Sequence, residues 1–232
     1  QAAVFGQFDV TPGTHSGAGG FIEVSSGRTL IFNGSVRAGV DKRTGTLLLD
    51  PKNITIGSGS DAISSAVFAT NASDNSTIAA STINSTLSAG TNVVLQANND
   101  ITVSTAITAA NEGGAGGVLI MQAGRSILIN ANITTDDGAL TLTANDTLAN
   151  GVVDAQRDSG AAVITMKTSG SGTTINTGAG TFRATISAGA DKENDTSGDI
   201  TLDNVTAGVL VVTNNGTGNI LGNGGGVLII AG

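Results

Sequence analysis

Apolar residues alternate with polar ones in short pairs, and these pairs recur along the chain in a longer unit. Alternation is the pattern of a half-buried β-strand, and recurrence at a step of roughly 20–26 residues is typical of a solenoid. Each unit holds two or three such strands separated by turn residues. The copies contain Ile22, Val24, Leu30, Phe32 and Val36; Val93, Leu95, Ile101, Val103 and Ile107; Leu119, Met121, Ile127, Ile129 and Ile133; Leu140, Leu142 and Leu148; and Ile200, Leu202, Leu210 and Val212.

One unit is too short to bury its apolar stripe alone, so neighbouring units have to cover it. Stacking the units as parallel coils covers the stripe and pairs the strand edges. We therefore expect an all-β fold, a right-handed parallel β-helix that runs through residues 1–232 as a single domain. With a rise of about 4.8 Å per coil, about ten coils would form a rod roughly 45–50 Å long.

The available side chains fit a narrow aliphatic interior. The chain has no Trp and no Tyr, and its apolar content of 39% comes mainly from Ala, Val, Ile and Leu. Gly19-Gly20, Gly116-Gly117 and Asn98-Asn99-Asp100 supply residue types that tolerate positive φ at tight corners. Only 2 Pro occur, which agrees with a chain whose backbone N–H groups mostly join β-ladders.

Residues 57–90 depart from the repeat pattern. They are rich in Ser, Thr, Asn and Ala and lack strict alternation. Ser81 or Thr82 would cap a short helix there, with Ile83 and Leu87 on one face and Gly90 at its end. We interpret this stretch as an irregular excursion from the β-helix and not as a second domain.

Charge and composition exclude several classes of partner. The formal net charge of −8 makes nucleic acid a poor partner, because phosphates require a basic surface. The absence of Cys excludes a disulfide framework and Cys-based zinc or redox sites. No apolar run has membrane-spanning length, so we expect no membrane insertion. The chain starts without Met and in the middle of the pattern, which predicts a fragment or a processed product.

Acidic residues are the first candidates for catalysis, because some parallel β-helices cleave polysaccharides. Asp136 and Asp137 are adjacent, and Asp199 and Asp203 are close in sequence. Glycoside cleavage needs two carboxylates that converge on the scissile bond. These four lie beside Gly, Asn and Thr, which favours a role in turns, and few aromatic residues are present to stack on sugar rings. We therefore expect no catalytic residue and no enzyme activity.

No cofactor or metal site is expected either. His15, the only histidine, has no arrangement that indicates a catalytic triad, and it reads as an exposed loop residue. The segment GNGGGVLII (222–230) has the glycines of a calcium-binding repeat but lacks the Asp.

Asn-x-Ser/Thr triplets are frequent, and they are candidate glycosylation sites in a secreted chain. The alternative is that Asn and Thr serve at the corners and on the exposed faces of a β-helix. The triplets begin at Asn33, Asn53, Asn71, Asn75, Asn84, Asn132, Asn145, Asn194, Asn204 and Asn215.

Segments that together cover nearly the whole chain resemble the filamentous-haemagglutinin-like exoproteins of two-partner secretion systems. The most specific is GTLLLDPKNITI (45–56), which follows GGFIEVSSGRTLIFNGSV (19–36). The others are STINSTLSAGTNVVLQANNDITV (81–103), GGVLIMQAGRSILINANITTDDGALTLTANDTLANGVVDAQRD (116–158) and SGDITLDNVTAGVLVV (197–212).

The resemblance implies a right-handed parallel β-helix exported through an outer-membrane pore and displayed on, or released from, a bacterial cell surface. It identifies the chain as a fragment of the internal shaft, since the secretion domain with its Asn-Pro-Asn motifs and an effector domain are not recognised in it. Members act as adhesins, matrix components, contact-dependent toxins or haem-acquisition proteins. The implied partners are a host or neighbouring-cell surface and extracellular polysaccharide, as in biofilms.

Three functions remain open from the sequence. The first is a structural or adhesive module of a large exoprotein. The second is a self-assembling extracellular fibre, in which copies stack head to tail through open coil ends, because an open end is an unpaired strand edge. The apolar segment VLII (227–230) favours this alternative. The third and weakest is a polysaccharide-active enzyme that uses the four aspartates.

Overall fold

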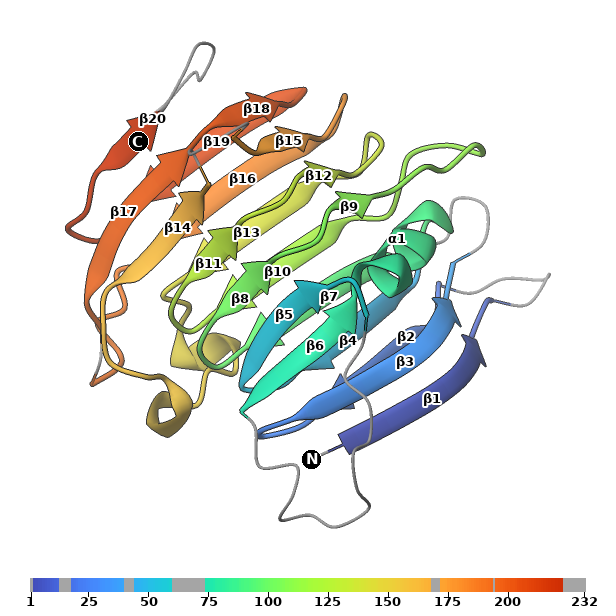
Figure 1. Ribbon diagram of the computed structural model, residues 1–232, viewed down its shortest axis with the longest axis horizontal. Helices are drawn as coiled ribbons and strands as arrows, with labels where there is room; N and C mark the ends of the chain where they lie inside the picture. Colours follow the sequence, from blue (N-terminus) through green and yellow to red (C-terminus); the bar gives the residue numbers. More distant parts are fainter. Residues whose placement is uncertain are drawn as a thin grey trace.

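The computed structural model describes residues 2–12, 18–39, 44–59, 74–167, 172–193 and 195–222. Two seven-stranded sheets and one four-stranded sheet make up most of this part of the chain, and a separate pair of strands lies near the N-terminus. Figure 1 shows the strands stacked side by side from β1 to β20, with the two termini at opposite ends of the stack.

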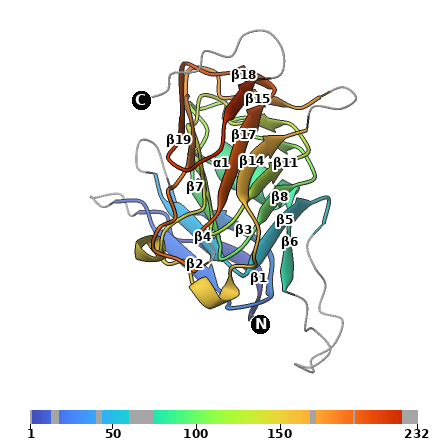
Figure 2. The same ribbon diagram turned by 90° about the vertical axis from the view of Figure 1, so that its left-hand side faces the viewer.

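Sheet I has the strand order β19-β16-β13-β10-β7-β4-β2, and sheet II has the order β20-β17-β14-β11-β8-β5-β6. Sheet I consists of β2 (Phe21–Ser25), β4 (Thr46–Asp50), β7 (Asn92–Ala97), β10 (Leu119–Ala123), β13 (Leu140–Ala144), β16 (Thr181–Ile186) and β19 (Val209–Asn214). Sheet II consists of β5 (Asn53–Gly57), β6 (Asn75–Ala79), β8 (Ile101–Val103), β11 (Ile127–Ile129), β14 (Ala162–Met166), β17 (Ser197–Leu202) and β20 (Ile220–Gly222). The two sheets face each other across the molecule (Figure 2).

Sheet III is the small sheet, and a two-stranded sheet precedes the stack. Sheet III contains β9 (Ile107–Thr108), β12 (Ile133–Thr134), β15 (Thr174–Asn176) and β18 (Asn204–Thr206). The pair consists of β1 (Ala2–Asp9) and β3 (Leu30–Arg37).

From β7 onwards the chain visits sheets I, II and III in turn, and each visit adds one strand beside the previous one. All pairs in the described part of the chain are parallel. The described chain is therefore mainly β, with parallel sheets arranged as in a solenoid. The described part of the chain contains no helix with the length and hydrophobicity of a membrane-spanning segment.

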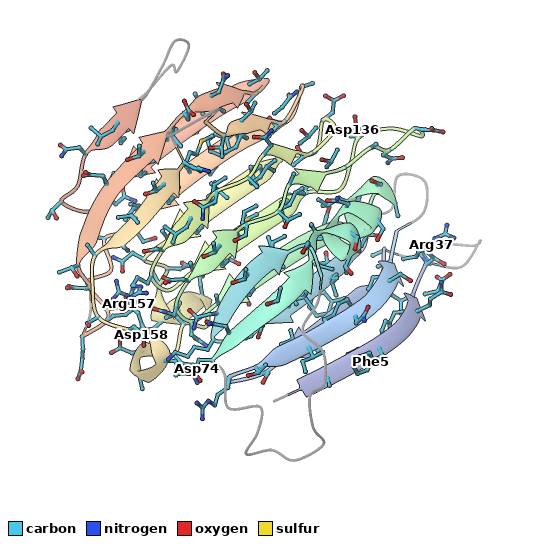
Figure 3. All side chains as sticks on the ribbon, in the orientation of Figure 1. Phe5, Arg37, Asp74, Asp136, Arg157 and Asp158 are labelled. Carbon is cyan, nitrogen blue, oxygen red and sulfur yellow. The ribbon has the colours of Figure 1, made fainter. Side chains whose placement is uncertain are left out.

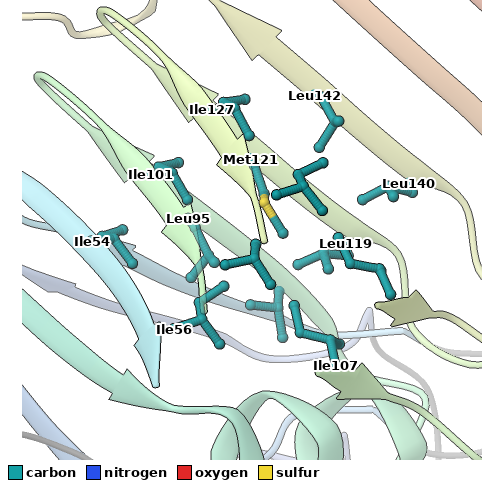
Figure 4. Close-up of a cluster of buried hydrophobic side chains, with 14 of the residues drawn as sticks. Ile54, Ile56, Leu95, Ile101, Ile107, Leu119, Met121, Ile127, Leu140 and Leu142 are labelled. Atoms are coloured by element: carbon teal, nitrogen blue, oxygen red, sulfur yellow. The ribbon is translucent and has the colours of Figure 1, made fainter. Parts of the chain in front are cut away.

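The core consists of rows of identical or similar aliphatic side chains, one from each strand. In sheet I, Leu95 pairs with Met121 and Met121 with Leu142, and all three are fully buried. In sheet II, Ile101 pairs with Ile127 in the same way. Figure 4 shows these side chains packed between the sheets. The strands predicted from alternation at 93–107 and 119–133 are confirmed, because their inward residues form these rows.

The interpretation of residues 57–90 as an irregular excursion is only partly right. Residues 60–73 lie outside the described residues, but β6 (Asn75–Ala79) pairs with β5 over its whole length and belongs to sheet II. Ser76 is fully buried there, and its hydroxyl accepts a hydrogen bond from the backbone N–H of Leu30 at 2.7 Å. The polar composition concealed this strand, since a buried Ser takes the place of an expected aliphatic residue.

The predicted short helix is present as α1 (Ala80–Ser88). Ile83 and Leu87 are fully buried, and Gly90 ends the helix with a φ of 71°. The predicted cap is wrong, because the N-cap residue is Ala79 and no side chain caps the first turn.

The predicted fourth copy is wrong at Leu148, which is 40% exposed. After β13 the chain leaves the sheets for residues 145–161, which we call the 145–161 insertion, and returns as β14. Ile164 of β14 then pairs with Ile127. The last predicted copy also combines strands of two successive coils. Ile200 belongs to β17 of sheet II, and Leu210 belongs to β19, the strand of sheet I that follows it.

Candidate functional site

The 145–161 insertion is the largest described departure from the repeat and lies at the corner between sheets I and II. It contains two short 3₁₀-helices, η2 (Leu148–Asn150) and η3 (Asp154–Gln156). In Figure 3, Arg157 and Asp158 of the insertion lie at the same corner of the molecule as Asp74. Neighbouring coils pass this corner with short turns such as 98–100 between β7 and β8. The insertion covers these turns.

Two amides of the 98–100 turn fix the insertion in place. Asn98 donates from Nδ2 to Gln156 Oε1 at 3.1 Å, and its Oδ1 accepts from the Val153 N–H at 2.7 Å. Asn99 Nδ2 donates to Asp158 Oδ2 at 2.9 Å, and the Asp158 N–H donates to Asn99 Oδ1 at 3.1 Å. Both asparagines are buried, so these hydrogen bonds fix the position of the insertion relative to the 98–100 turn.

Two buried cations hold the insertion from its inner side. Arg157 donates from Nε to Gly124 O at 2.8 Å and from its terminal nitrogens to Asn145 Oδ1 and three further carbonyls. Burial lowers the pKa of the Arg157 guanidinium from its ordinary value. Lys192 donates from Nζ to the carbonyls of Asn145 and Asp146 at 3.2 and 2.6 Å. These cations bind mainly backbone carbonyls of the protein itself, so their role is structural.

Ion pairs complete the outer edge of this corner. Lys52 Nζ lies 3.0 Å from Asp74 Oδ2 and 3.3 Å from Asp158 Oδ1. The hydrogen bond to Asp74 raises the pKa of Lys52, and hydrogen bonds from Arg28 and then Lys52 lower the pKa of Asp74. Arg125 pairs with Asp100 through both Nε and Nη2, at 2.9 and 2.5 Å.

A polar hollow of about 230 Å³ lies between the insertion and the outer face of sheet I. It adjoins a smaller hollow, because Asp50, Asn98 and Gly151 line both. The larger hollow is lined by Ser25, Ser26, Gly27, Asp50, Asn98, Gly151, Val153 and Gln156. We take this polar hollow as the candidate site, since a concave surface with convergent polar groups is where ligands bind.

The floor of the two adjoining hollows is a row of polar residues on successive strands of sheet I. Ser25 pairs with Asp50, and Gln96 pairs with Gln122. The register in which Leu49 pairs with Leu95 places Asp50 beside Gln96. Gln96 Nε2 donates to Gln122 Oε1 at 3.0 Å, and Gln122 Nε2 donates to Asp146 Oδ2 at 3.1 Å.

Asp50 is the titratable group of the site. No described residue donates a hydrogen bond to its carboxylate, which lines the hollow. Burial, and secondarily the nearby charge of Glu23, raises the pKa of Asp50 from 3.8 to about 6. The Asp50 carboxylate is thus a strong acceptor that lacks a partner within the described protein.

Replacing Asp50 by Asn is expected to stabilise the protein above pH 6 by about 1–2 kcal/mol. The folded pKa of Asp50 is raised, so the contribution of this group to stability is fully present below pH 3.8 and is lost as the pH rises to about 6 and above. The full pKa shift would give a larger effect, but partial solvation of the carboxylate reduces it. Urea unfolding across this pH range measures the difference. Equal stability of the two proteins at neutral pH would contradict the prediction.

The carboxylates of the four aspartates considered for catalysis are occupied by backbone groups. Asp136 and Asp137 lie in a turn and Asp203 in the link between β17 and β18, as predicted, whereas Asp199 belongs to strand β17. Their carboxylates accept backbone N–H groups of other coils: Asp136 from Asn111, Asp137 from Ala179, Asp199 from Asn219 and Asp203 from Thr173, at distances of 2.5 to 3.1 Å. Asp136 and Asp137 have φ values of 54° and 63°, which a tight corner requires. Among the described residues no group of three His, Asp or Glu side chains is placed to hold a metal ion. His15 and segment 223–230 lie outside the described residues.

Several triplet asparagines have structural hydrogen bonds. Asn53, Asn84 and Asn132 accept backbone N–H groups of neighbouring coils at 2.9 to 3.1 Å. Asn145 is fully buried, and its Nδ2 donates to Ser187 O and Asp195 O, so the folded chain offers no access to it.

The other triplets differ in exposure. Asn33, Asn75, Asn132, Asn204 and Asn215 are exposed, and their glycosylation remains a proposal. Asn71 and Asn194 lie outside the described residues.

Sequence reasoning did not identify Asp50, Gln96 and Gln156 as site residues. A signal was present for the first two, because LLLD (47–50), VVLQ (93–96) and LIMQ (119–122) each place a polar residue after three apolar ones, in the same register. Gln156 gave no such signal, since it belongs to the insertion. Comparisons with protein-family models, with curated proteins and with solved structures found no match to this chain.

Proposed function

We propose that this chain is a structural and adhesive module of a large bacterial exoprotein that is secreted or displayed on the cell surface. In this proposal the chain folds as a right-handed parallel β-helix of about ten coils. Right-handed winding is supported by the rule that connections between parallel strands of one sheet are nearly always right-handed. The resemblance of the sequence to filamentous-haemagglutinin-like exoproteins supports the location and the adhesive role.

The observation that carries the proposal is the continuous aliphatic core. Buried residues from Leu30 to Val212 form one cluster that runs through all three sheets. Such a core gives an elongated module in which every strand supports the next. The four aspartates considered for catalysis favour this role over catalysis, because their carboxylates accept backbone N–H groups.

Labelling and adhesion experiments test the proposal. An antibody against the chain should label intact cells or the culture medium of the organism that encodes it. Beads coated with the chain should adhere to bacterial cells, host cells or extracellular polysaccharide more than beads coated with another acidic protein. Labelling only after cell lysis would contradict the location, and adhesion equal to that of the control beads would contradict the adhesive role.

A self-assembling fibre is a second candidate, favoured by where exposed apolar side chains lie. Phe5 and Phe21 are 51% and 61% exposed at one end of the stack, and Val209 and Leu221 are 54% and 45% exposed at the other. Such ends fit a head-to-tail contact between copies of the chain. The apolar segment 227–230 lies outside the described residues.

Sedimentation velocity at increasing concentration tests the fibre. Wild-type chains should form long assemblies, and Phe21→Ser should shorten them. A wild type that stays monomeric at high concentration would contradict the fibre and leave the adhesive module unaffected.

A further inference from the structure

The orientation of the amides around the polar hollow is fixed by hydrogen bonds. A carboxylate only accepts, so Gln122 must present its NH₂ group to Asp146 and its carbonyl oxygen to Gln96. Gln96 therefore uses its NH₂ group on Gln122. Its own carbonyl oxygen, Oε1, has no hydrogen bond in the described structure and stays available as an acceptor beside Asp50.

The opposite wall is fixed in the same way. The Val153 N–H can only donate, so Asn98 must turn its Oδ1 to Val153 and its NH₂ group to Gln156 Oε1. Gln156 consequently presents its NH₂ group to the hollow. A Cβ atom on Gly27, which also lines the hollow, would lie 3.6 Å from Gln156 Nε2, which agrees with this orientation.

The larger hollow thus offers the two carboxylate oxygens of Asp50 as acceptors and an NH₂ donor from Gln156. Gln96 Oε1 adds a third acceptor in the smaller hollow that adjoins it. A ligand that fits this set must donate two or three hydrogen bonds on one side and accept one on the other. Neighbouring hydroxyl groups of a sugar do both. A volume of about 230 Å³ suits a single sugar unit.

We propose that the polar hollow between the 145–161 insertion and sheet I binds a neutral sugar unit, which donates hydrogen bonds to Asp50 and accepts one from Gln156, with Gln96 as a further acceptor for a neighbouring hydroxyl in the adjoining smaller hollow. This inference rests on the adhesive part of the proposed function and names its ligand class. Uronates and sulfated sugars are disfavoured, because Asp50 and Glu23 give this surface a negative charge. No aromatic side chain lines the hollow, so binding of one sugar is weak and adhesion depends on many sites acting together.

Saturation-transfer NMR with the complete 232-residue chain tests this site. The probes are neutral hexose oligosaccharides, N-acetylhexosamine oligosaccharides and oligouronates. We expect binding of a neutral sugar that Asp50→Asn weakens by about tenfold, because hydrogen bonds to a charged group are stronger than those to a neutral one. Asp199→Asn is the matched control, since Asp199 lies on sheet II, and it should bind like the wild type. Affinity of the wild type should rise as the pH increases through about 6.

Three results would overturn the sugar site. They are the lack of binding to any neutral sugar, equal binding by the wild type and Asp50→Asn, and a preference for oligouronates. Calorimetric titration with CaCl₂ tests whether the hollow is a cation site instead. If the chain binds calcium through Asp50 and binds no sugar, the hollow is assigned to a cation. Bead adhesion by a wild type that shows none of the expected sugar binding would refute this site while leaving the proposed adhesive function intact.

Discussion

Replacing Leu95 by Ala is expected to lower the free energy of unfolding by about 3 kcal/mol. Leu95 is fully buried in the middle of sheet I, with Leu49 on one side and Met121 on the other. Because each strand supports the next, the loss of one side chain leaves a cavity that both neighbours share. Few residues can move to fill it, since the row above and below is equally packed (Figure 4).

Val94→Ala is the matched control for this change. Val94 precedes Leu95 in the same strand but points outward and is only half-buried. Its truncation should cost less than about 1 kcal/mol. Urea unfolding followed by circular dichroism gives both values. Similar losses in the two variants would show that the inward rows do not carry the stability of the stack.

Replacing Arg157 by Ala is expected to cost about 3–5 kcal/mol, or to release the 145–161 insertion from the corner. The guanidinium is only 3% exposed and bonds to Gly124 O and Asn145 Oδ1. Removing it leaves these acceptors buried without a donor, and an unsatisfied buried group costs more than a hydrogen bond contributes. Lys at this position would restore the charge but not the planar fork of donors.

Arg183→Ala serves as the comparison, because Arg183 is exposed on β16 and should contribute less than about 0.5 kcal/mol. Hydrogen exchange separates global from local effects. We expect faster exchange of residues 145–161 in Arg157→Ala than in the wild type. Protection and stability equal to those of Arg183→Ala would contradict the structural role of Arg157.

The strands could be predicted from sequence where the alternating apolar residues are also the ones that pair with inward residues of the neighbouring strands. Ile101, Ile127 and Ile164 occupy one inward row, and the first two were recognised because their strands recur at a regular step. The third was missed because the 145–161 insertion breaks the step. Leu148 continues the apolar alternation of β13 after the backbone has already left the sheet, so the pattern alone places it in the core.

The polar hollow was harder to predict because its residues come together only through stacking. Asp50 and Gln156 are far apart in sequence and lie on different coils. The turn roles of Asp136 and Asp137 were predictable, because residue type and local sequence decide them. The hydrogen bonds of Asn98 depend instead on an insertion whose path no local pattern reveals.

The 145–161 insertion also has a mechanical consequence. In a stack of parallel strands, backbone hydrogen bonds run along the stack axis, so tension on the two ends pulls strand pairs apart. Asn98, Asn99 and Gly124 belong to turns at two successive heights, and the insertion bonds to all three. Its side-chain bonds therefore share the load with the backbone bonds between β7 and β10. Under tension this central region should yield last, and coils far from the insertion should open first.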